Sequence, residues 1–199
     1  ALKLEEAVGE GIGEGRLLRA LDTLAKVRMM TGQFEAAREI AGRGLRAGAS
    51  GSLRGGFLRT LSLVASYEGK VEEARQNAGE AAALARSMGD ERGEALAESC
   101  AAMIDQRRGD LHAALDHYRR SESLYETSGF VGGLPVVLMN VGTIHYQLGE
   151  FTSALEKFRS SLAVARRIEK LSTIAASMIN LGNLLIYFGA HEEAGLLLE

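Results

Sequence analysis

Few residues of this chain have both the type and the spacing that chemistry requires. The four histidines are His112, His117, His145 and His191, and only the first two are close in sequence. Because helix faces repeat every three or four residues, a separation of five is poor for two metal ligands, and we interpret these as surface or half-buried histidines. Cys100 is the only cysteine, so no internal disulfide can form. With no histidine or aspartate at catalytic-motif spacing, we interpret it as a small buried hydrophobe.

A glycine-rich run from Gly9 to Gly15 alternates glycine with other residues, as a phosphate-binding loop does. No Lys-Ser or Lys-Thr pair follows it, no apolar strand precedes it, and Glu10 and Glu14 would repel a phosphate. We therefore interpret the run as a turn. With no constellation of catalytic residues elsewhere, we predict that the chain is not an enzyme and needs no cofactor and no metal.

Charge and composition exclude further classes of function. The formal net charge is −3 at pH 7, which gives no general attraction to nucleic acid or to anionic membranes. Basic pairs such as Arg119-Arg120 are not interleaved with aromatic residues, so we predict no nucleic-acid binding. No apolar run has the length of a membrane span and no signal peptide is visible, so we predict no membrane insertion and a cytoplasmic location.

One short skeleton recurs along the chain: glycine, any residue, an apolar residue, two further residues, then alanine. The copies begin, at steps of 37, 40, 40 and 40 residues, at Gly32, Gly69, Gly109, Gly149 and, more weakly, Gly189. A fixed period in this range is typical of stacked-repeat proteins. Glycine suits the left-handed residue that ends a helix, and alanine five positions later indicates a close helix crossing. The skeleton therefore predicts antiparallel helix hairpins.

The apolar pattern then places the helices and the repeats. We expect helices over residues 14–30, 33–47, 53–68, 71–87, 91–107, 111–127, 151–168 and 171–187, with two more that start near 134 and 191. Ser52 and Asp90 are expected N-caps, and Pro135 is expected in a first helical turn. We predict one solenoid over residues 1–199, with repeats at about 14–50, 51–89, 90–129, 130–169 and 170–199, and with 1–8 as the tail of a preceding repeat.

With these residues, the sequence resembles the tetratricopeptide repeat (TPR) family. The best copy runs from Asn140-Val141-Gly142 through Leu148-Gly149-Glu150-Phe151 to Ala154 and Phe158, and Asn180-Leu181-Gly182-Asn183 repeats its first half. The period of about 40 residues is longer than the standard 34, as in the variety common in bacterial signalling regulators. The resemblance implies an all-α, right-handed solenoid of antiparallel helix hairpins.

The resemblance also implies that the first helix of each hairpin lines a concave groove. Its residue positions, carried onto this sequence, give a candidate peptide-binding set: Met103, Arg107, Met139, Asn140, Thr143, Tyr146, Ile179, Asn180, Asn183 and Tyr187. Asparagine can bond both the N–H and the C=O of a bound backbone, while methionine and tyrosine adapt to partner surfaces. Packing against the neighbouring repeat explains any single member equally well.

Two classes of function stay open. The first is a protein–protein interaction scaffold that binds a peptide or helical segment of a partner protein in the groove. The second is a ligand- or peptide-sensing segment of a larger bacterial signalling or transcription regulator. We also expect self-association through apolar solenoid ends, at Leu2, Leu4, Leu196, Leu197 and Leu198.

Overall fold

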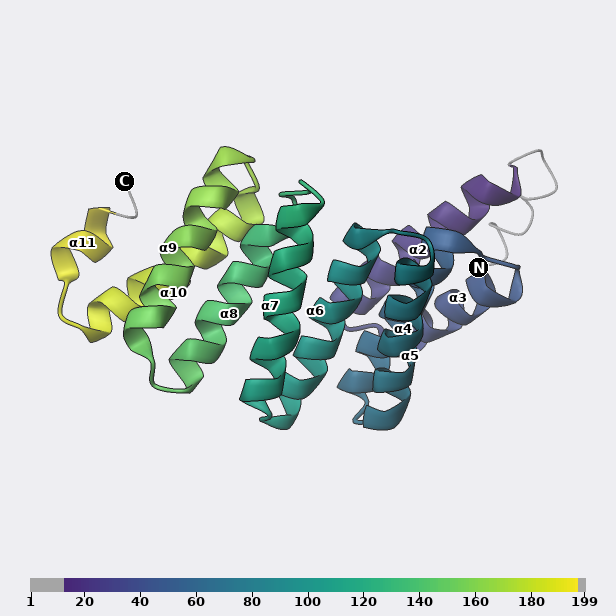
Figure 1. Ribbon diagram of the computed structural model, residues 1–199, viewed down its shortest axis with the longest axis horizontal. Helices are drawn as coiled ribbons and strands as arrows, with labels where there is room; N and C mark the ends of the chain where they lie inside the picture. Colours follow the sequence, from purple (N-terminus) through teal and green to yellow (C-terminus); the bar gives the residue numbers. More distant parts are fainter. Residues whose placement is uncertain (1–12, 197–199) are drawn as a thin grey trace. The chain divides into compact units, whose positions relative to one another are not determined.

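The computed structural model describes residues 13–196, and within that range every regular element is an α-helix (Figure 1). Their bounds are α2 (Glu14–Met30), α3 (Phe34–Arg46), α4 (Gly51–Tyr67), α5 (Val71–Ser87), α6 (Glu91–Arg108), α7 (Leu111–Thr127), α8 (Leu134–Gln147), α9 (Phe151–Arg167), α10 (Leu171–Tyr187) and α11 (His191–Leu196). The expected helices are confirmed, each to within two residues at the ends that were predicted. The predictions for residues 1–8, Leu197 and Leu198 lie outside the described residues.

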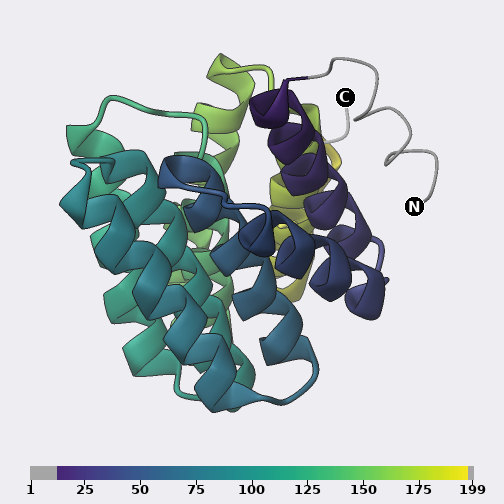
Figure 2. The same ribbon diagram turned by 90° about the vertical axis from the view of Figure 1, so that its right-hand side faces the viewer.

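Helices α2 and α3, α4 and α5, and α8 and α9 pair as antiparallel hairpins, and the first of these can be followed in both views (Figures 1 and 2). Contacts divide the chain into two compact units, one ending at Ile104 and the other beginning at Asp105, so that the division falls within α6. The first unit contains α2 to α5 and most of α6, and the second contains the last turn of α6 and α7 to α11. The single repeat array expected from the sequence stays a prediction.

The turn from α8 to α9 shows how the skeleton glycine works. Gly149 has a φ of 77°, a left-handed conformation that costs glycine nothing sterically. Its N–H donates to the carbonyl of Tyr146 at 3.0 Å, and the N–H of Glu150 donates to the carbonyl of His145 at 2.9 Å. These two bonds form a Schellman motif, which satisfies carbonyls that the end of α8 would otherwise leave open.

The alanine of the skeleton lies where the two helices of a hairpin meet. Ala37, Ala74, Ala114 and Ala154 are fully buried, and Ala194 is 8% exposed. In the second unit Ala154 belongs to one buried apolar cluster formed mainly by Phe158, Leu162, Leu181, Leu184 and Leu185. The close crossing predicted from an alanine at this position is therefore confirmed.

Helix starts agree with expectation at two of three positions. Pro135 lies in the first turn of α8, where its missing N–H has no helical partner to lose. The carboxylate of Asp90 accepts a hydrogen bond from the N–H of Gly93 at 2.8 Å and so caps α6. The prediction for Ser52 is wrong, because Ser52 lies inside α4, which begins at Gly51. The N-cap residue is Ser50, whose side chain makes no capping hydrogen bond.

No helix among residues 13–196 combines the length and the apolar character needed to cross a membrane.

Candidate functional site

A cavity of about 330 Å³ opens on the second unit, on the side formed by the first helices of its hairpins. Helices α8 and α10 supply most of the lining and α9 supplies one aromatic ring; the lining residues are Thr143, Tyr146, Gln147, Phe158, Asn180 and Asn183. The cavity has more apolar than polar lining, with a few polar groups that converge on it. This is the usual character of a ligand-binding site in proteins.

Helical spacing brings the polar residues to the cavity. Thr143 and Gln147 are four residues apart on α8, and Asn180 and Asn183 are three apart on α10, so each pair shares a helix face. The floor depends on Gly142, because a β-carbon at that position would lie 2.7 Å from the ring of Phe158. The small residue therefore lets Phe158 of α9 reach between the two first helices.

The amides of the groove have no internal hydrogen-bond partner. Asn140, Asn180 and Asn183 make no hydrogen bond to another residue within the described range 13–196. Thr143, by contrast, donates to the carbonyl of Met139 at 3.0 Å, and Gln147 accepts a bond from Gln106 at 3.3 Å. Each asparagine can therefore offer two donors and an acceptor to a bound molecule.

Aromatic rings extend the apolar surface from the cavity to the hairpin turns. Phe151 contacts Tyr146, Tyr187 and Phe188, with ring centroids 5.6, 5.2 and 5.9 Å apart. Tyr146 is 48% exposed, Tyr187 66% and Phe188 53%, although aromatic side chains usually contribute to burial. On α10, Ile179 is also 62% exposed and, four residues before Asn183, shares a helix face with it. Exposed apolar side chains beside a cavity are typical of interaction surfaces.

The predicted groove residues are brought together only in part. Thr143, Tyr146, Asn180 and Asn183 line one cavity. Met139 instead packs against the buried cluster of the second unit, which is the structural alternative considered for such residues. Asn140 and Met139 are half-buried, while Ile179 and Tyr187 are exposed and lie in the same unit outside the lining.

Met103 and Arg107 fall at the division between the units. Met103 is half-buried in the first unit, and Arg107 is exposed in the last turn of α6, in the second. The structure brings neither to the lining of the cavity. Two lining residues, Gln147 and Phe158, are absent from the predicted set. The sequence feature that could have predicted Phe158 in the lining is Gly142, whose lack of a side chain leaves room for the ring.

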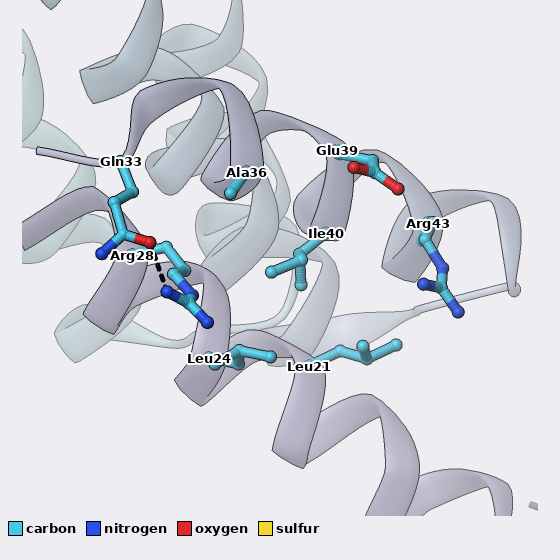
Figure 3. A pocket seen from close by; sticks show the side chains of 8 residues that line it. All are labelled: Leu21, Leu24, Arg28, Gln33, Ala36, Glu39, Ile40 and Arg43. Carbon is cyan, nitrogen blue, oxygen red and sulfur yellow. Dashed lines mark hydrogen bonds between the residues drawn. The ribbon is translucent and has the colours of Figure 1, made fainter. Parts of the chain in front are cut away.

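A second cavity, also of about 330 Å³, lies between α2 and α3 of the first unit (Figure 3). Leu21, Leu24 and Ile40 point into it, and the side chain of Arg28 donates a hydrogen bond to Gln33 at one end. His145 and Glu150 make the corresponding contact across the next unit's α8–α9 turn, with 2.5 Å between Nδ1 and Oε2. Because this contact recurs at the same place relative to the turn glycine, we interpret it as a hairpin brace and not as ligand recognition.

Charged side chains of the first unit join successive helices. Arg38 of α3 pairs with Glu68, with Nη2 and Oε2 2.7 Å apart, and with Glu73 of α5. The hydrogen bond that Arg38 donates to Glu73 is the main cause that raises the pKa of Arg38. Lys70 and then Arg38 hold the pKa of Glu68 below its ordinary value. Because these groups are partly exposed, water screens their interaction, and we assign them a modest stabilising role.

The surroundings of Cys100 and of the histidines indicate packing roles and not chemical ones. Cys100 is buried, and burial raises its pKa to about 11, which leaves almost no thiolate at neutral pH. His117 lies with Nε2 3.6 Å from the buried carboxylate of Asp105. Over residues 13–196 no three His, Cys, Asp or Glu side chains gather in a way that would hold a metal ion.

Comparison with known proteins agrees with this architecture. The tetratricopeptide repeat family model matches residues 134–199. A comparison with curated proteins by sequence found no match.

Solved structures match nearly the whole chain at low sequence identity. BtubC (BKLC) from P. vanneervenii is 19% identical, with a TM-score of 0.74 over 98% of this chain and 83% of that chain. A Rap protein complexed with competence and sporulation factor is 15% identical, with a TM-score of 0.77 over 98% and 55%. A signal transduction ATPase with numerous domains and a tetratricopeptide repeat sensor, from Pyrococcus horikoshii, is 15% identical, with a TM-score of 0.75 over 92% and 30%.

These matches confirm the predicted fold class, an all-α solenoid of TPR-like antiparallel hairpins. Such repeats typically serve as non-catalytic scaffolds for protein interaction. Residues 134–199 therefore match the tetratricopeptide repeat family model, and the solved structures show the fold of such repeats over nearly the whole chain.

Proposed function

We propose that this protein is an interaction module that holds an extended peptide segment of a partner protein in the groove between α8 and α10. The observation that carries the proposal is the cavity lined by Thr143, Tyr146, Asn180 and Asn183, with both asparagines lacking internal hydrogen-bond partners. Asn180 is half-buried, and a half-buried amide without a partner loses hydration and gains no bond in return, so a ligand that supplies the bond is favoured.

The polar and the apolar side chains of this groove have different roles in binding. The asparagine amides bond to the backbone of the segment, which gives affinity with little dependence on the peptide sequence. The exposed rings of Tyr146 and Tyr187, together with Ile179, contact apolar side chains of the segment and select among sequences. Asn140, which lies forty residues before Asn180 at the same place in the preceding hairpin, extends the row of amides along the segment.

The test begins with a library of random peptides selected against the full chain. The best selected peptide is titrated calorimetrically with the parent and with the double variant Asn180→Ala/Asn183→Ala. Each lost hydrogen bond costs about 0.5–1.5 kcal/mol, so we expect the double variant to bind roughly 5- to 150-fold more weakly. Asn77→Ala, a variant of α5 in the first unit, is the matched control and should bind like the parent.

Two outcomes contradict the proposal. One is a selected peptide that binds the folded double variant as tightly as it binds the parent, which would place binding outside this groove. The other is a selection that returns no peptide with saturable binding. Circular dichroism confirms beforehand that both variants are folded.

The second candidate is a sensing segment of a larger regulator, in which ligand binding changes the conformation of the repeats. It is favoured by how much of two larger proteins the chain covers: it spans 55% of the Rap protein and 30% of the ATPase with a tetratricopeptide repeat sensor. Amide hydrogen exchange separates the two candidates. A binding module gains protection at α8 to α10 alone when peptide is added, whereas a sensor also changes exchange in α2 to α5.

A further inference from the structure

One face of α2 is exposed at positions where the corresponding later helices are buried. Val27 lies five residues before the turn glycine Gly32 and is 48% exposed. Its counterparts, five residues before the later turn glycines, are at most 1% exposed: Val64, Ile104, Ile144 and Leu184. Ala20, on the same face of α2, is exposed as well. Its counterparts are at most 2% exposed: Phe57, Ala97, Val137 and Ser177. Helix α2 therefore presents an apolar face that a neighbour covers in the other helices.

The neighbour that covers this face elsewhere is the helix that follows the preceding turn glycine. Ile104 of α6 packs with Ala74 and Ala78 of α5, which lie five and nine residues after Gly69. Leu184 of α10 packs in one cluster with the residues at the same two places in α9. The cover that α2 requires is therefore a helix with two apolar residues four positions apart.

The cavity between α2 and α3 lies on the side where such a helix would pack (Figure 3). Leu24 and Ile40 point into this cavity of about 330 Å³. Lys157 has the place of Ile40 in its own hairpin and pairs with Glu122 of the preceding helix α7, with Nζ and Oε1 2.9 Å apart. Leu181 has the place of Leu24 and packs with residues of the preceding helix α9. Both walls of the cavity therefore face the position of a preceding helix.

We propose that this docking slot, formed by Ala20, Leu24, Val27 and Ile40, binds an amphipathic helix formed by residues 1–8 of the same chain. These residues lie outside the described range. Elsewhere the connection into the next such helix is short, as in residues 88–90 before α6 and 128–133 before α8. Residues 9–13, which join the segment to α2, have a length within that range.

The spacing of small residues sets the register of the docked segment. Gly44 of α3 faces Phe57 of α4 so closely that a β-carbon at Gly44 would lie 2.2 Å from the ring. These two residues are 13 positions apart, and Ala7 and Ala20 have the same separation. In the proposed complex Ala7 therefore takes the place of Gly44, opposite Ala20.

The same register covers Val27. Leu4 precedes Ala7 by three residues and takes the place that Ala78 has in α5. Ala78 packs with Ile104, which is the counterpart of Val27. Leu4 is therefore the residue of the segment that buries Val27.

Charge and tethering both favour this occupant. Helices α2 and α3 together have seven basic and four acidic residues, whereas residues 1–8 have one basic and two acidic residues. Opposite net charges favour the pairing. A short connection gives the segment an effective concentration in roughly the millimolar range, which a second copy of the chain at micromolar concentration does not reach.

The test uses a thiol at position 27 of the full chain as its reporter. Val27→Cys is made in the Cys100→Ala background, so that the new thiol is the only one, and its alkylation by iodoacetamide is timed. The same protein with Leu4→Gln added gives the comparison. We expect the thiol to react roughly tenfold more slowly when Leu4 is present, because a docked segment must open before the reagent reaches it.

Met30→Cys in the same background is the matched control, since Met30 is 79% exposed in the last turn of α2 and lies outside the slot. Its thiol should react at the same rate with and without Leu4→Gln, which also shows that α2 stays folded. Equal rates for Val27→Cys with and without Leu4→Gln overturn the proposal. Protection that is lost on dilution also overturns it, because the occupant is then a second copy of the chain.

Discussion

The carboxylate of Asp22 lies directly against the α-carbon of Gly56, so that an added β-carbon would be only 2.5 Å from Oδ1. Asp22 comes from α2 and is 9% exposed, and Gly56 is buried in α4. The contact couples the first helices of two successive hairpins. It also explains a glycine inside a regular helix, where alanine would be preferred if space allowed.

Gly56→Ala should therefore destabilise the protein. The helix gains about 0.5–1 kcal/mol from alanine, whereas displacing a packed carboxylate costs typically 1–3 kcal/mol, so the expected net loss is about 1 kcal/mol. Gly79→Ala in α5 is the control, because a β-carbon there has nothing within 4 Å, and it should stabilise. Urea unfolding measures both. If Gly56→Ala stabilises as much as Gly79→Ala does, the close contact with Asp22 does not oppose a side chain at this position, and the prediction is wrong.

Gly142 and Gly182 occupy the same place in successive hairpins, yet their surroundings differ. A β-carbon at Gly142 would lie 2.7 Å from the ring of Phe158 and 3.3 Å from the carbonyl of Ala154, while Gly182 has open space. Gly142→Ala should lower the free energy of unfolding by about 1–3 kcal/mol, and Gly182→Ala should raise it by about 0.5–1 kcal/mol. Thermal melting of the two variants checks this. Shifts in the same direction would contradict the assigned packing.

Ala154→Phe should be among the most damaging single substitutions. Ala154 is fully buried where α9 crosses α8, and its carbonyl already faces Gly142. A phenyl group there forces the two helices apart, at a cost of at least about 1–3 kcal/mol. Ala163→Phe, at an exposed position of the same helix, controls for the change in residue type. A melting temperature for Ala154→Phe that equals the parent's would show that the hairpin register is wrong.

Stability at high pH should depend on Cys100. Burial raises its pKa to about 11, above the value of about 8.5 expected for an unfolded chain. Below pH 8.5 the thiol is protonated in both states, and as pH rises towards 11 the unfolded state loses the proton first and is favoured. Relative to Cys100→Ala, the parent should lose roughly 3 kcal/mol of unfolding free energy over this window. Parallel pH profiles for the two proteins would contradict the assigned burial of the thiol.

Local pattern was enough to predict the helices of this protein. The ends of α5, α7 and α10 coincide with the predicted residues, because a glycine turn and an apolar period are properties of neighbouring residues. The N-cap of α4 was missed for a related reason. Ser50 and Ser52 are equally good cap residues by type, and the helix begins at Gly51 between them.

Local sequence pattern predicts only part of the lining of the groove. The repeat register predicted that Thr143, Tyr146, Asn180 and Asn183 share one side, and the structure places all four around one cavity. Met139 has the same register, yet it is half-buried and packs against the buried apolar cluster of the second unit. Phe158 entered the lining because Gly142 has no side chain to block it.

The sequence by itself determined the hairpins, their turn glycines and the buried alanines, since each depends on residues within one or two helical turns. Only the tertiary structure decided which polar groups remain unpaired. Arg38 of α3 pairs with Glu68 and Glu73, whereas Asn180 and Asn183 have no hydrogen-bond partner among residues 13–196. Pairing depends on distances between residues some 30 positions apart, and these are set by how helices pack rather than by any period along the chain.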